Sequence, residues 1–216
     1  MPKVKLPRNS PSIDMTPMVD LAFLLVTFFM LTTKFRPEEP VKVVIPSSVS
    51  TTKIPENLTT ISIDSAGRVF IDMDGKDVRP QVLQAVMQKY KQPITTLDMS
   101  RFAVMGAFGV PINQLRQYIE ADDAQRKIMS NASAGIPKDT LKNDELADWI
   151  NASLSYSEQD YASKQAKNPT VKRMRYAIKA DGTSKYKIVK EVMDICQKQG
   201  IQHFELITSL KSMPKS

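Results

Sequence analysis

The stretch "SIDMTPMVDLAFLLVTFFMLTTKF", Ser12 to Phe35, is the most apolar part of this 216-residue chain. Between Met15 and Thr33, 13 of 19 residues are Met, Val, Leu, Ala or Phe. At about 1.5 Å per residue, a helix of that length extends roughly 29 Å, close to the hydrocarbon thickness of a bilayer. Pro17 suits its first turn. The stretch therefore predicts one transmembrane helix over residues 15–33.

The charges flanking this run predict its orientation. Three cations precede the run and two follow it: Lys3, Lys5, Arg8, Lys34 and Arg36. Because cytoplasmic flanks carry the excess of Lys and Arg, residues 1–14 are expected to form a cytoplasmic arm, with the bulk of the chain outside the cytoplasm. No small-residue cleavage site follows the run, which favours a retained span over a removed signal peptide.

One carboxylate, Asp20, lies within the apolar run. A charge on a membrane helix costs on the order of 2.5–3.5 kcal/mol, so such residues usually face a protein interior or a wet cavity. At 100° per residue, Thr16 and Thr27 lie within roughly 40° of Asp20. We define this set, with Pro17 in the same turn, as the polar stripe. A single helix cannot shield the stripe from lipid, so partner helices are expected.

Two roles for Asp20 are consistent with this pattern. Removal from water favours the neutral form of a carboxylate, which makes Asp20 a candidate reversible proton carrier. Alternatively, Asp20 is structural, either paired with a cation of a partner or hydrogen-bonded to threonine. The residues alone leave both interpretations open.

Residues 34–58 read as an extended linker, because they contain four prolines and a Ser/Thr-rich stretch. Within it, "VKVVI" at residues 41–45 has strand character. An isolated strand needs a neighbour, so this segment is predicted to pair with a domain or with another chain. The candidate contact residues are Val41, Val43, Ile45 and Pro46.

Residues 59–216 predict a small α/β domain, which makes the fold class α+β. "TTISID" and "RVFID" predict a hairpin, and "RPQVLQAVMQKYK" predicts a helix. "RMRYAIKA", "SKYKIVKEVMDICQKQG" and "QHFELIT" predict a closing strand–helix–strand unit. Residues 93–170 are expected to be a helical insertion, in which Trp149 covers a small apolar cluster.

Composition narrows the function class. One cysteine and one histidine exclude a disulfide framework and argue against zinc, so no metal and no cofactor is expected. No phosphate-binding loop or nucleophile motif is present, so an enzyme is not expected.

The last quarter of the chain is basic: from Ser163 to Ser216 there are 12 Lys/Arg and 4 Asp/Glu. This excess suits either a solvated face or an anionic partner, but no nucleic-acid motif accompanies it.

These pieces resemble the ExbD/TolR family of bacterial inner-membrane proteins. "TPMVD" matches the family's T-P-x-[IV]-D signature, and "VKVVIPSS" resembles the segment beyond its span. The closing strand–helix–strand is also similar, with Asp181 and Tyr186 filling a D-x-x-x-x-Y spacing. The likeness covers about 12–92 and 173–208. The insertion resembles longer ExbD-like proteins of Bacteroidetes-type bacteria.

The resemblance implies a subunit of a motor driven by the proton motive force. Two copies of the chain, a homodimer, would thread a ring of an ExbB/TolQ-like polytopic protein, usually a pentamer. The family's functional aspartate falls on Asp20, and the periplasmic domain would engage a TonB-like transducer. The alternative is a membrane-anchored periplasmic adaptor that binds peptidoglycan or partner proteins, with a structural Asp20.

Overall fold

The computed structural model describes residues 15–32, 47–48, 57–138, 144–207 and 209–210. The chain divides into two compact units, Met1–Pro37 and Glu38–Ser216. The first unit contains one described helix, α1 (Thr16–Thr32), which is shorter than the predicted span over residues 15–33. Across the described ranges, no helix meets the length and apolarity needed to traverse a bilayer.

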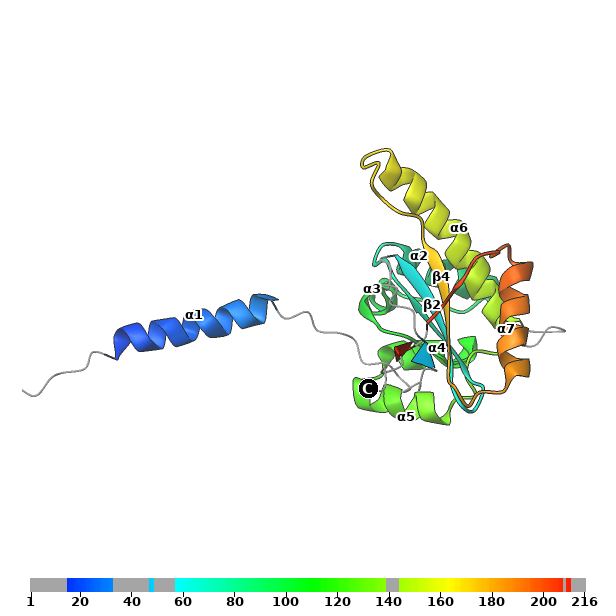
Figure 1. Ribbon diagram of the computed structural model, residues 1–216, viewed down its shortest axis with the longest axis horizontal. Coiled ribbons are helices and arrows are strands. Elements are labelled where there is room, and N and C mark those ends of the chain that lie inside the picture. The colour runs from blue at the N-terminus through cyan, green and yellow to red at the C-terminus, as the bar shows by residue number, and fades with distance from the viewer. Residues whose placement is uncertain (1–14, 33–46, 49–56, 139–143, 208, 211–216) are drawn as a thin grey trace, which may run out of the picture. The chain divides into compact units, whose positions relative to one another are not determined.

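The second unit is organised around a four-stranded mixed sheet in the order β3-β2-β4-β5 (Figure 1). β2 (Leu58–Ile63) and β3 (Val69–Met73) form the predicted antiparallel hairpin. β4 (Arg175–Ala180) and β5 (Glu205–Leu206) are parallel and are connected through α7 (Tyr186–Lys198), as the closing strand–helix–strand predicted. The α+β class is confirmed. β5 is shorter than the run "QHFELIT" predicts.

Five further helices lie in the described part of the domain. α2 follows the hairpin, and the other four lie within residues 93–170, where the sequence predicts helices. Their bounds are α2 (Val78–Lys89), α3 (Thr96–Val104), α4 (Ile112–Glu120), α5 (Asp123–Ala132) and α6 (Glu145–Gln165).

The core lies against one face of the sheet. Along β2, Ile61 and Ile63 are buried, while Thr60 and Ser62, which alternate with them, are partly exposed. This alternation follows from the two-residue period of a strand with one covered face. The helices supply much of the rest of the core, and α2 contributes Val82, Leu83, Val86 and Met87.

Trp149 occupies the main core, so its predicted place over a small separate cluster is wrong. Its side chain is 1% exposed. The indole stacks on Phe102 with ring centroids 6.1 Å apart and meets Phe108 edge-on at 4.9 Å. These three aromatic residues come from the insertion and belong to the same buried cluster as Ile61 of β2 and Ile178 of β4, so the insertion shares its core with the sheet.

The linker and the chain end contribute a second, very short ladder. Ser47 and Ser48 form β1, which pairs in parallel with β6 (Ser209–Leu210). An extended backbone carries hydrogen-bonding groups that need partners, and β6 supplies them here. The predicted strand at 41–45 lies outside the described residues.

Candidate functional site

The polar stripe lies on α1, which is helical without interruption from Thr16 to Thr32. Spacings of four and seven residues therefore keep Thr16, Asp20 and Thr27 on one side of the helix. Thr16, Pro17 and Asp20 line a shallow open hollow together with Val19 and Phe23. The Thr27 hydroxyl donates to the carbonyl oxygen of Leu24 at 2.9 Å, which satisfies it within the helix.

The rest of α1 presents apolar side chains on every side. The large ones are between 56% and 87% exposed, with Leu25 and Val26 at the lower limit and Leu31 at the upper. Water is a poor solvent for so much contiguous apolar surface, so this helix needs another covering. Asp20 is thus a lone carboxylate on a helix that is otherwise apolar or hydroxylic.

The other predicted contact residues, Val41, Val43, Ile45 and Pro46, lie outside the described residues. The family-like pair Asp181 and Tyr186 is placed at the turn between β4 and α7. The Asp181 carboxylate accepts from the backbone N–H and the hydroxyl of Thr183, at 2.9 and 2.6 Å. It therefore orders the turn, while Tyr186 is 75% exposed at the start of α7.

Sequence reasoning missed an acidic cluster at the start of α6. The Asp148 carboxylate accepts from Lys89 and, at 2.8 Å, from the Tyr90 hydroxyl. Burial and this bond raise the pKa of Tyr90. Nearby, Glu145 accepts from the backbone N–H of Ile112 at 2.9 Å, and burial raises its pKa. The cluster joins α2, α4 and α6, so its observed role is to hold the insertion against the domain.

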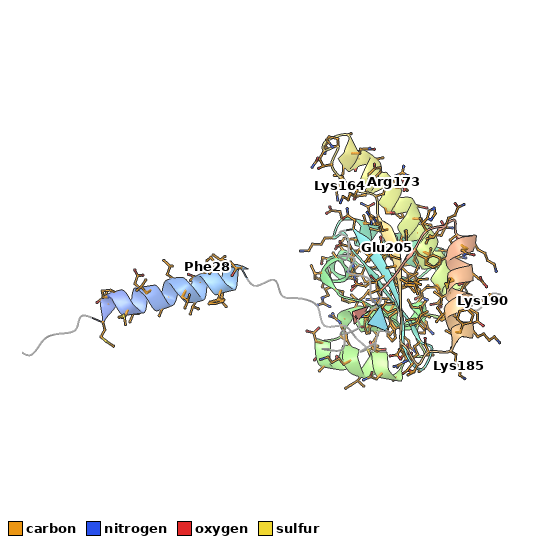
Figure 2. All side chains as sticks on the ribbon, in the orientation of Figure 1. Phe28, Lys164, Arg173, Lys185, Lys190 and Glu205 are labelled. Atoms are coloured by element: carbon orange, nitrogen blue, oxygen red, sulfur yellow. The ribbon has the colours of Figure 1, made fainter. Side chains whose placement is uncertain are left out.

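A second feature missed by the sequence reasoning is a basic projection. We call residues 158–174, the second half of α6 and the segment returning to β4, the arm; Lys164 and Arg173 mark it in Figure 2. Lys164 contacts Asp160 at 2.9 Å and Asp77 at 3.0 Å, and both hydrogen bonds raise its pKa. The signal in the sequence is the run of cations after Ser163, whose spatial grouping no periodicity indicated.

Metal chemistry has no visible basis in the described ranges, where no group of three or more His, Cys, Asp or Glu side chains could hold an ion. The candidate functional regions are therefore the polar stripe of α1 and the arm of the domain.

Comparison with known proteins gives one match. The family model described as biopolymer transport protein ExbD/TolR matches residues 7–211. No curated protein and no solved structure was found to match the chain. The family match includes α1, the linker, the sheet and the insertion.

Proposed function

Because the chain belongs to the ExbD/TolR family of biopolymer transport proteins, we propose that it is the inner-membrane subunit of a motor driven by the proton motive force. The family is one of transport proteins rather than enzymes, and a role in energising transport follows from membership. The specific roles of α1, Asp20 and the partners are the content of the proposal.

The observation that carries the proposal is the position of Asp20 within an apolar helix. In the proposed arrangement, residues 15–33, which include α1, lie in the membrane, with residues 1–14 in the cytoplasm and the domain in the periplasm. The polar stripe faces a second copy of α1 and a ring of an ExbB/TolQ-like partner. These partners are proposed because Asp20 must be shielded from lipid. The apolar side chains exposed around the rest of α1 then contact lipid or the ring.

Proton transfer at Asp20 supplies the drive. Within the partner ring the carboxylate takes a proton from one side of the membrane and releases it to the other after a rotation. A membrane potential of 100 mV provides about 2.3 kcal/mol for each charge moved, well above thermal energy. Thr27 has a smaller part, since its hydroxyl is already bonded to Leu24. The domain passes the motion to a TonB-like transducer.

An adaptor function is the second candidate. The excess of 12 cations over 4 acids from Ser163 onward favours contact with an anionic polymer such as peptidoglycan. In that case Asp20 only holds the helices of the complex together, and its ionisation is irrelevant.

Asp20→Asn separates the two candidates, since it keeps the shape and hydrogen-bonding capacity of the side chain but cannot titrate. Asp14→Asn is the matched control, as it removes a carboxylate just before the apolar run. We expect Asp20→Asn to abolish energised transport and proton flux into vesicles, with expression and partner binding retained, and Asp14→Asn to keep both activities. Full proton-driven activity in Asp20→Asn would exclude the carrier role and leave the adaptor.

Topology and assembly have their own tests. A reporter fused after Ser216 should be active outside the cytoplasm. Cysteines placed at Lys42 or Val44 should form disulfides between two chains if the linker strand pairs across the proposed homodimer. Cytoplasmic reporter activity would contradict the orientation, and cross-links confined to single chains would contradict the exchange of strands.

A further inference from the structure

The arm projects beyond the rest of the domain (Figure 1). None of its residues 158–174 is buried, so burial of apolar surface does not account for its order. Polar contacts order it instead. Lys164 joins Asp160 of the arm to Asp77 at the start of α2. Arg173 lies 5.1 Å from the ring centroid of Tyr161.

These contacts engage the carboxylates of the arm but not all of its cations. Glu158 lies 3.8 Å from Arg173, and Asp160 is paired with Lys164. Lys167 and Lys172 are exposed, and no carboxylate of the described residues lies within ion-pair distance of either ammonium group. The arm therefore presents two uncompensated positive charges.

A pocket of about 360 Å³ opens at the base of the arm. Its apolar walls come from Val78, Tyr161, Val171 and Met174, and Val78 is 2% exposed. Lys172, Lys164 and Asp160 also line it. Lys164 is already paired with Asp160 and Asp77, so the hollow combines apolar walls with one uncompensated cation, Lys172. Lys167 lies in the turn that follows α6, where its backbone N–H donates to the carbonyl oxygen of Lys164 at 3.0 Å.

The positive charges and the apolar walls of the pocket together indicate which class of partner fits it. A phosphate or a lipid headgroup would use the ammonium groups and leave the apolar walls without a partner, and a neutral glycan would leave the charges unmatched. A peptide uses both, because one aliphatic side chain can enter the hollow while flanking carboxylates meet the lysines. We propose that the arm and its pocket bind an extended acidic segment of a partner protein, with an aliphatic residue between carboxylates.

The test uses the full chain in detergent micelles and a fluorescein-labelled probe peptide, Gly-Glu-Asp-Leu-Asp-Glu-Gly. Fluorescence anisotropy reports binding at low salt. The double variant Lys167→Glu/Lys172→Glu should weaken binding at least about tenfold. The matched control, Lys187→Glu/Lys190→Glu, changes two exposed lysines of α7 and should leave affinity within about twofold. Circular dichroism establishes that both variants are folded.

Three further measurements test which features of the partner the pocket recognises. Val171→Asp, which places a carboxylate in the pocket wall, should abolish binding. A probe with Gly in place of Leu should bind at least about tenfold more weakly. Glycerol phosphate, standing in for a lipid headgroup, should compete only at much higher concentration than unlabelled probe.

The opposite results overturn the proposal. They are absence of binding at millimolar probe, equal loss in the α7 control, equal affinity of the leucine-free probe, or competition by glycerol phosphate at matched concentration. The Asp20→Asn variant should bind the probe peptide with the same affinity as the natural chain. Loss of peptide binding can therefore be told apart from loss of the proton-carrier role.

Discussion

The backbones of Ile71 and Phe108 exchange two hydrogen bonds, 2.9 and 3.0 Å long, each N–H donating to the carbonyl oxygen of the other. β3 is an edge strand of the sheet, and this pair binds the insertion to its outer side. The N–H of Ile136 donates to the carbonyl of Val69 at 3.0 Å, and Arg79 donates to that of Met73 at 2.9 Å. The insertion and one buried guanidinium thus cover an edge that would otherwise be open to strand addition.

Arg79→Met should destabilise the domain. The guanidinium donates to the carbonyl oxygens of Met73 and Gly106 at 2.9 and 2.8 Å, and the Arg79 residue is 6% exposed. Removing it leaves two carbonyls without their donors, which we expect to cost about 2–4 kcal/mol. Arg79→Lys keeps one donor and should cost less. Urea unfolding measures both, and a lysine variant as unstable as the methionine variant would contradict a contribution from the one donor that lysine keeps.

Trp149→Ala should cost about 3–5 kcal/mol, because it empties the centre of the core. Trp149→Phe should cost much less. The indole N–H has no hydrogen-bond partner in the described structure, so phenylalanine keeps most of the contacts with Phe102 and Phe108 and removes an unsatisfied donor. Thermal unfolding followed by circular dichroism compares the two. A phenylalanine variant as unstable as the alanine variant would contradict this account.

Glu145 should make the stability of the domain depend on pH. Burial, only partly offset by the bond from Ile112, raises its pKa above the ordinary value of 4.5. The native state then binds this proton more tightly than the unfolded chain. The stabilisation is complete below the unfolded pKa and is lost as pH rises through the folded pKa.

Glu145→Gln removes that titration but keeps an acceptor for the Ile112 N–H. The free energy of unfolding of the variant should therefore improve relative to the natural chain as pH rises from about 4 to 7. Glu120→Gln, an exposed carboxylate next to Arg116, is the control and should show no such trend. Urea unfolding followed by Trp149 fluorescence measures the difference, and an opposite slope would refute the assignment.

Cys196 should be inert to thiol reagents in the folded protein. The side chain is 1% exposed, and burial raises the pKa of its thiol to about 12. At pH 8 only about one molecule in ten thousand then carries the reactive thiolate. Iodoacetamide should label the chain only after denaturation. Rapid labelling of the native chain would contradict the burial and would also disturb the cross-linking at Lys42 or Val44.

The elements that the sequence predicted correctly are those governed by local patterns. The β2–β3 hairpin follows from two β-rich runs around Gly67, and α7 follows from an apolar stripe that contains Val192, Ile195 and Cys196. Polar stripe residues could likewise be placed on one helix face from spacing alone. The proton-carrier role of Asp20 stays a prediction.

The features that could not be predicted depend on contacts between distant residues. The pairing of Ile71 with Phe108 and the place of Trp149 in the main core have no local signature, because neither periodicity nor composition specifies which segments meet. The same holds for the contact of Lys164 on α6 with Asp77 at the start of α2, whereas its contact with Asp160 is a local pair four residues apart on one helix. A count of charges indicated a basic region but not its shape.

The two-residue ladder between β1 and β6 has a mechanical consequence for a chain anchored through α1. While Ser47 and Ser48 are paired, a pull on α1 reaches the domain at β1, through the 14 residues 33–46. Once those few hydrogen bonds part, the load reaches Asn57, and the tether gains the ten residues 47–56. At about 3.3–3.6 Å per residue, ten residues can span at most roughly 35 Å. If α1 is anchored as proposed, parting of the ladder would lengthen the connection between the anchor and the sheet.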